Sequence, residues 1–97
     1  MKVVVKRVGK IGEVQEIEDS LNVLQYLVGG YITTYPFKND MLIICNEEGL
    51  LMGLYPNLQV GGELIVGDIV IVKQGEEDFE SLDEAQIKTL KDMRLIK

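Results

Sequence analysis

The sequence predicts an α+β fold in a single domain, residues 1–97, with a mostly antiparallel sheet and two short helices. Short apolar runs rich in β-branched residues alternate with Gly, Asn and Asp turns, a pattern typical of antiparallel strands. Two segments repeat apolar residues at helical spacing behind capping residues. The predicted order is β-β-α-β-β-β-β-β-α, with the sheet either curled or partly closed into a barrel. A chain of 97 residues leaves no room for a second domain.

The chain opens with a predicted β-hairpin. Residues 2–8 are mostly β-branched and predict a strand, and Gly9 to Gly12 predict its turn. Residues 14–18 form a mostly polar stretch, which suits an exposed partner strand.

The first helix is predicted from its caps and its spacing. Asp19 and Ser20 are good N-caps, and Leu21, Leu24 and Leu27 recur on one helical face. Gly29-Gly30 ends this helix after about nine residues, because glycine adopts the left-handed C-cap conformation easily.

A second hairpin is expected from the strands 31–35 and 41–45, with Pro36 ending the first strand or marking a sheet edge. Beyond it the sequence predicts a turn at 46–49, a short strand at 50–54, a turn at 55–57 and a loop at 58–62. In the 46–49 turn, Gly49 is expected to permit a positive φ.

The C-terminal third contains the apolar strands 63–66 and 69–72, and Gly67-Asp68 between them predicts a bulge or a tight hairpin. An acidic loop, 74–80, follows. Ser81 and Glu84 have the spacing of a capping box for a closing helix through Met93, and Phe79 is expected to be its hydrophobic staple. The runs 41–45 and 69–72 are apolar throughout and require cover on both faces, by helices, barrel closure or a second subunit.

Charge and composition exclude several classes of protein. The net charge is −6, from 16 acidic and 10 basic side chains with no Lys/Arg cluster, so we expect no direct binding to nucleic acid. There is no histidine, the commonest general base and metal ligand. The single Cys45 ends an apolar strand and is expected to be a buried structural cysteine in a reducing compartment. With no apolar run long enough for a membrane span or a signal peptide, we expect a cytoplasmic protein with no membrane partner.

The candidate site is a polar cluster around two tight turns. It comprises Asn46, Glu47, Glu48 and Gly49 in the first turn and Tyr55 and Asn57 in the second. Carboxylate and amide groups can read a base edge or a ribose, and a tyrosine can stack on a base. We therefore expect these residues to bind a small polar ligand, provided that Lys2, Lys6, Arg7 or Lys73 lies near enough to offset the acidic field around a phosphate.

The sequence predicts no catalytic residue, no metal site and no cofactor. Glu47 and Glu48 are adjacent and diverge on a strand or a turn, so they make a poor acid–base pair. The acidic residues match no EF-hand spacing, and zinc would lack its usual nitrogen and sulfur ligands. Neither Gly29-Gly30 nor Gly61-Gly62 sits in a phosphate-binding motif.

Read in this order, the chain resembles a family of small proteins from phages, plasmids and Firmicutes, catalogued as domain of unknown function 3846. Several segments spread over most of the chain carry the resemblance: Lys2–Val5, Val28–Ile32, Asn46–Gly49, Gly53-Leu54, Pro56-Asn57, Ile65–Gly67 and Asp78–Leu82. Tyr55 departs from the small residue or proline expected there. The resemblance implies a setting, a mobile element in a bacterial host cytosol, where small acidic proteins often block a defence protein, mimic nucleic acid or sequester a signalling nucleotide.

Three hypotheses follow. The first is a non-enzymatic, homo-oligomeric binding protein of a phage or mobile element, possessing a counter-defence role and capturing a nucleotide-derived ligand. The second is an acidic inhibitor that docks on a basic host or defence protein. The third is a small carboxylate-dependent hydrolase, for which Glu47→Gln would abolish turnover. Salt separates the first two, because docking between charged surfaces weakens steeply as salt rises.

Overall fold

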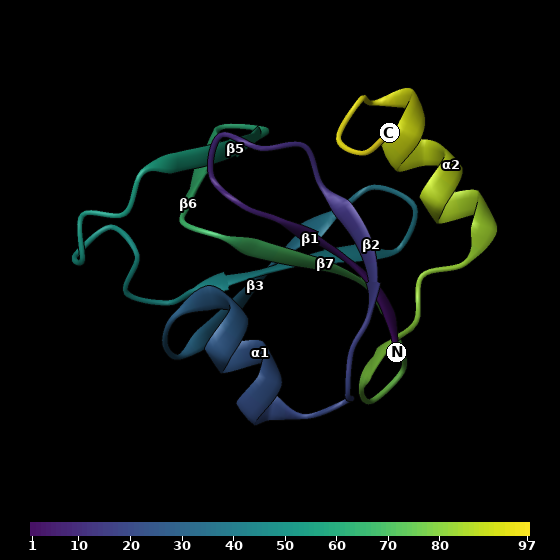
Figure 1. Ribbon diagram of the computed structural model, residues 1–97, viewed down its shortest axis with the longest axis horizontal. Helices are drawn as coiled ribbons and strands as arrows, with labels where there is room; N and C mark the ends of the chain where they lie inside the picture. The colour runs from purple at the N-terminus through teal and green to yellow at the C-terminus, as the bar shows by residue number, and fades with distance from the viewer.

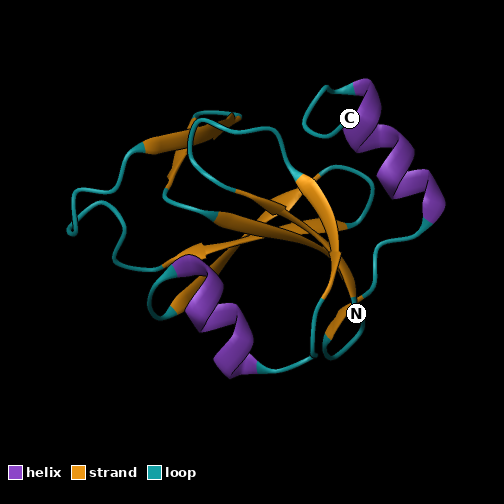
Figure 2. Ribbon diagram, in the orientation of Figure 1, coloured by secondary structure: helices purple, strands orange, loops and turns teal.

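An antiparallel sheet with one helix on each face forms the body of the molecule (Figures 1 and 2), as described by a computed structural model of residues 1–97. The strand order is β2-β1-β7-β4-β3, with β8 also paired to β7, and a separate ribbon contains β5 and β6. The elements are β1 (Lys2–Lys6), β2 (Glu13–Glu16), α1 (Leu21–Val28), β3 (Ile32–Phe37), β4 (Met41–Asn46), β5 (Pro56–Val60), β6 (Glu63–Val66), β7 (Ile69–Gln74), β8 (Phe79–Glu80) and α2 (Glu84–Asp92).

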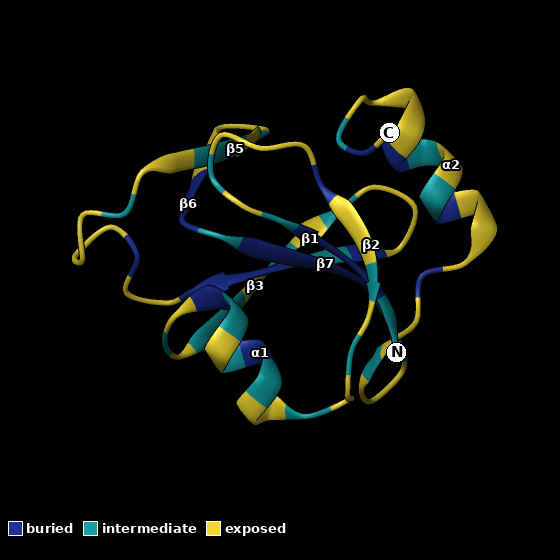
Figure 3. Cartoon of the chain, viewed as in Figure 1, coloured by how far each residue is buried: buried dark blue, intermediate teal, exposed yellow.

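Each face of the sheet buries its own apolar cluster. Successive strand residues point to opposite faces, so Val4 packs in the cluster with Leu90 of α2, whereas Val3 and Val5 pack in the cluster with Leu24 of α1. The β5–β6 ribbon adds its apolar side to the α2 cluster. The central strands are consequently buried on both sides (Figure 3). The near-continuous apolar runs of β4 and β7 follow from this double cover.

The fold class and several elements predicted from the sequence are confirmed. The chain is α+β, its strand pairs are antiparallel, and β3 and β4 form the expected hairpin. Helix α1 begins after Ser20, whose side chain accepts a hydrogen bond from the Val23 N–H, and ends at Gly29 with φ 81°. The alternative of a partial barrel is wrong, because β2 and β3 lie at opposite ends of the strand order and do not pair with each other. Neither α1 nor α2 has the length and apolar character that a membrane-spanning helix requires.

The segment from residue 50 to residue 62 differs from its prediction. Residues 50–54 form turns rather than a strand, since the Gly53 N–H bonds the Leu50 carbonyl and the Leu54 N–H bonds the Gly49 carbonyl. The expected loop at 58–62 lies largely in strand β5, whose partner is β6. Gly67-Asp68 therefore makes no hairpin: β6 belongs to the ribbon and β7 to the main sheet.

The entry to α2 also differs. Its capping box is formed by Asp83 and Gln86, because the helix begins three residues after Ser81. Ser81 instead accepts a hydrogen bond from the Lys2 N–H at 2.9 Å. Phe79 is not the staple of α2, since it packs on the opposite face of the sheet, against the α1 cluster. Leu82, which directly precedes the cap, is buried in the α2 cluster.

Candidate functional site

Asn46, at the end of β4, is buried with 5% of its surface exposed. Its Nδ2 donates to the Val28 carbonyl oxygen at 3.2 Å, and its Oδ1 accepts from the Glu48 N–H at 2.8 Å. Both ends of this amide are therefore engaged within the chain, where they hold the 46–49 turn against the end of α1.

Asn57 occupies a register shift between Pro56 and Leu58 in β5. Its Nδ2 donates to the backbone carbonyls of Lys6 at 2.9 Å and Gly67 at 2.8 Å, and its Oδ1 accepts from the Lys6 ammonium. Burial lowers the pKa of Lys6. Asn57 thus connects the end of β1 to the β5–β6 ribbon, and its amide is also used within the chain.

The other predicted site residues differ in exposure. Glu47 and Glu48 are exposed at the turn, and Tyr55 has 77% of its surface exposed. Gly49 is buried and is absent from the residues with positive φ. Glycine is required there by close approach, because a Cβ at this position would lie 2.8 Å from Val66 Cγ2. The expected positive φ at Gly49 is wrong.

The predicted site residues fall beside two separate hollows. Asn46, Glu47 and Gly49 line one of about 290 Å³ beside β3, which we call the edge hollow. Tyr55 lines another of about 550 Å³, whereas Glu48 and Asn57 line neither. The structure therefore brings together three residues of the first turn and separates them from Tyr55.

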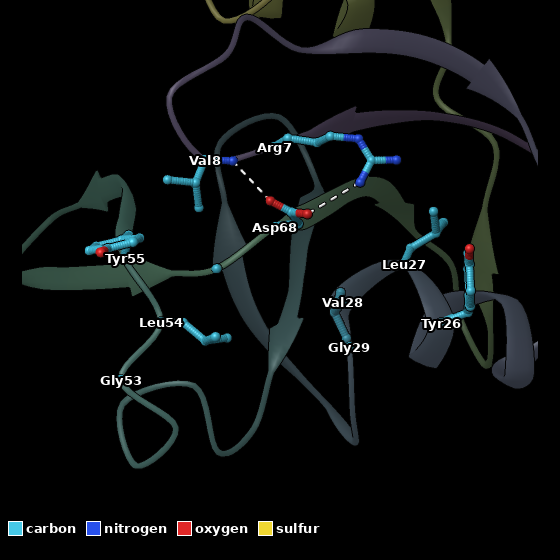
Figure 4. A pocket seen from close by; sticks show the side chains of 11 residues that line it. Arg7, Val8, Tyr26, Leu27, Val28, Gly29, Gly53, Leu54, Tyr55 and Asp68 are labelled. Atoms are coloured by element: carbon cyan, nitrogen blue, oxygen red, sulfur yellow. Dashed lines mark hydrogen bonds and ion pairs between the residues drawn. The ribbon is translucent and has the colours of Figure 1, made fainter.

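The hollow beside Tyr55 has an ion pair in its wall. Arg7 Nη1 lies 3.2 Å from Asp68 Oδ2, and the Val8 N–H donates to Asp68 Oδ1 at 2.9 Å. We call this space the Arg7–Asp68 hollow. Tyr55 lies on one side of it and Tyr26 of α1 on the other (Figure 4). About half of the Arg7 side chain is exposed, so its guanidinium is available to a ligand.

Most of this hollow was missed by sequence reasoning. The sequence indicates Arg7 only as a source of positive charge, and Asp68 as part of a turn or as a carboxylate that could join Glu47 or Glu48. The two residues are 61 positions apart and share no motif, so no signal in the sequence joins them. The position of Tyr26 in the predicted helix favours a place at the margin of its apolar face, yet the residue is 85% exposed.

The remaining reactive groups lie apart from this hollow. Cys45 is buried at the end of β4, and burial raises the pKa of its thiol. A buried thiol with a raised pKa is a poor nucleophile. No three of the Asp, Glu and Cys side chains gather closely enough to hold a metal ion.

Residues 1–94 match the family described as Domain of unknown function (DUF3846), and the chain therefore belongs to that family. The resemblance inferred from the sequence is confirmed. No curated protein and no solved structure matches the chain.

Proposed function

We propose that this member of the DUF3846 family is a non-enzymatic binding protein that holds a small, planar, polar ligand of nucleotide type in the Arg7–Asp68 hollow. One observation carries the proposal: an exposed tyrosine, a guanidinium and a carboxylate line the same space of about 550 Å³. Aromatic faces with a few convergent polar groups are typical of small-molecule sites.

Each of these groups has a role in the proposed site. The ring of Tyr55 offers a face on which a base can stack, an interaction worth about 1–3 kcal/mol per base. The guanidinium of Arg7 can hold a phosphate through two parallel hydrogen bonds. The Asp68 carboxylate accepts hydrogen bonds and can take one from a ribose hydroxyl or an exocyclic amine.

Charge limits the class of ligand. Asp68 is paired with Arg7, so the two formal charges of the hollow cancel, and the whole chain carries −6. A ligand with one phosphate, or with phosphates in cyclic diesters, suits this balance better than a triphosphate. Lys6 is held by Asn57, which leaves Arg7 as the cation for the phosphate.

The predicted site residues take different parts in this proposal. Tyr55 keeps its stacking role. Asn46 and Asn57 act by fixing the turns and strands around the hollow, through the hydrogen bonds described above. In the setting that the family resemblance implies, a phage or mobile element, capture of a signalling nucleotide would serve counter-defence in the host cytosol.

A second candidate is docking on a host or defence protein, and the segment Leu50–Met52 favours it. These three consecutive apolar residues are 75%, 88% and 55% exposed, and the acidic Glu47 and Glu48 precede them. Contiguous exposed apolar side chains beside charge are typical of protein interfaces. The acidic flank suits a partner with a basic rim, and such binding should weaken as salt rises.

Native mass spectrometry of the protein purified from bacterial cells, and again after incubation with a mixture of mononucleotides and cyclic dinucleotides, tests the ligand proposal. We expect a defined added mass of nucleotide size on the wild-type protein. Arg7→Gln and Tyr55→Ala should lose it. Lys10→Gln removes the same charge outside the hollow, and Tyr31→Ala removes an exposed tyrosine elsewhere, so both should retain it.

Two results would overturn the ligand proposal. One is bare wild-type protein under both conditions, which leaves protein docking as the better candidate. The other is an added mass that persists in both Arg7→Gln and Tyr55→Ala, because the ligand would then bind elsewhere.

A further inference from the structure

The main sheet has two edge strands, and they differ in how they are protected. Strand β2 contains Glu13 and Glu16, and Gly12 just before it is bridged to Ile96 near the C-terminus. Strand β3, with sequence ITTYPF, carries no charge. Charged and covered edges resist pairing with another chain, whereas an uncharged open edge invites it.

The register of β3 shows which backbone groups face outward. The Glu47 N–H donates to the Tyr31 carbonyl at 2.8 Å, which marks Tyr31 and Glu47 as a hydrogen-bonded pair. Because such pairs alternate along antiparallel strands, Thr33 and Tyr35 also bond β4, and Ile32 and Thr34 point their backbone groups away from it. Pro36 has the outward parity too, as expected for a residue without an N–H.

These outward groups are complementary to those of a second β3 strand. If two copies meet antiparallel across a two-fold axis at Thr34, each Thr34 exchanges both backbone hydrogen bonds with its counterpart. The same register sets each Ile32 N–H opposite the Pro36 carbonyl of the other copy. Because Pro36 has no N–H, it donates no hydrogen bond to Ile32 of the other copy, and this loss affects only the two ends of the paired strands.

The face of β3 opposite α1 adds apolar surface beside the edge. Thr33 and Tyr35 line the edge hollow together with Leu50, Leu51 and Leu64, and the three leucines are exposed. A two-fold axis at Thr34 brings two of these apolar margins onto the same face of a continuous sheet. Backbone pairing and apolar burial then act at one interface.

We infer that the protein forms a symmetric homodimer by antiparallel pairing of β3 with β3 of a second copy, which joins the two main sheets into one. The inference is independent of the proposed ligand site, because the Arg7–Asp68 hollow contains no residue of β3.

Sedimentation equilibrium combined with amide hydrogen exchange tests the dimer. We expect a mass of twice 10.9 kDa that falls toward the monomer on dilution. The Ile32 and Thr34 amides should be protected in the dimer and exchange fast at dilutions that favour the monomer. The Thr33 and Tyr35 amides, which bond β4, should stay protected at both concentrations.

A matched pair of edge variants identifies the interface. Thr34→Lys places two like charges opposite one another at the two-fold axis and should raise the dimer dissociation constant by about 10-fold or more. Val14→Lys makes the same charge change at an exposed, outward position of β2 and should leave the constant unchanged.

Three results would overturn the inference. These are a monomer at every concentration, a dimer that Thr34→Lys does not weaken, and a dimer in which the Thr34 amide of the wild-type protein exchanges as fast as in the monomer. The exchange measurement uses the wild-type protein alone, so it tests the β3–β3 interface even if Thr34→Lys fails to fold.

Discussion

The side-chain amide of Asn46 donates a hydrogen bond to the carbonyl oxygen of Val28, at 3.2 Å. Asn46 ends β4 and Val28 ends α1, so this bond fixes the helix to the sheet. It also satisfies a carbonyl in the last turn of the helix, which has no partner within the helix itself. Asn46 has a side chain of the kind that often contacts ligands, but its amide forms its hydrogen bonds within the protein.

Asn46→Ala should lower the free energy of unfolding by about 1–3 kcal/mol, because it leaves the buried Val28 carbonyl and the Glu48 N–H without their partner. Urea denaturation of the variant measures this change. Glu47→Gln, at the exposed neighbouring position, is the control and should stay within about 0.5 kcal/mol of wild type. Equal stability of Asn46→Ala and wild type would contradict the structural role.

Asn57→Ala should loosen the β5–β6 ribbon from the sheet. The substitution removes the hydrogen bonds to the Lys6 and Gly67 carbonyls and to the Lys6 ammonium, at a cost of about 1–3 kcal/mol. Amide exchange should accelerate first in β5 and β6, since a two-stranded ribbon is marginal alone. Gln59→Ala, an exposed change in the same strand, should leave exchange unaltered. Uniform acceleration across the main sheet would contradict a local role.

Local signals explain why part of the fold was predictable. Helix α1 has its cap, its apolar spacing and its terminating glycine within ten consecutive residues, 20–29. Every signal that predicts this helix is therefore local in the sequence. The β3–β4 hairpin is joined by a short turn and was equally clear. Elements that depend on partners distant in the sequence were not predictable in this way. Whether β6 pairs with β5 or with β7 is decided by packing and by contacts such as Asn57 with Lys6, 51 positions apart.

The same distinction applies to the candidate site. The polar cluster could be predicted because its residues are close in sequence. Which of them can contact a ligand depends on burial and hydrogen bonding in the folded protein. Asn46 is engaged by the fold, whereas Tyr55 remains exposed. Arg7 and Asp68 meet only after β1 and β7 pair, so their ion pair follows from the tertiary structure.

Asp83 gives the stability of α2 a defined pH dependence. The Gln86 N–H, which donates to its carboxylate at 2.8 Å, and then the Lys73 ammonium at 3.3 Å lower the pKa of Asp83. A pKa lowered by folding means that the ionised group stabilises the folded state above its unfolded pKa of about 3.9. This stabilisation is lost as the pH falls below that value and through the lower pKa of the folded state.

Asp83→Asn isolates this contribution, because asparagine still caps a helix but carries no charge. The urea midpoint of wild type should exceed that of the variant at neutral pH. The difference should shrink below about pH 3.9 and vanish once Asp83 is protonated in the folded protein. A difference that stays constant from neutral to acidic pH would show that the charge of Asp83 is not its cause.

Gly67→Ala should destabilise the protein more than Gly61→Ala does. Both glycines have a positive φ, 80° and 59°, which costs an alanine about 1–2 kcal/mol. At Gly61 a Cβ meets nothing within 4 Å, whereas at Gly67 it lies 2.7 Å from Leu54 Cδ1. Overpacking of this kind adds about 1–3 kcal/mol. Leu54 also lines the Arg7–Asp68 hollow, so its displacement should change the environment of Tyr55.

Thermal denaturation and the tyrosine NMR signals of the two glycine variants measure these effects. Gly61→Ala should lower the stability modestly and leave the Tyr55 signals in place. Gly67→Ala should lower it further and shift those signals. Equal losses of stability would mean that Leu54 yields freely to the added methyl group. The contact between Gly67 and Leu54 would then set neither the packing of the ribbon nor the shape of the hollow.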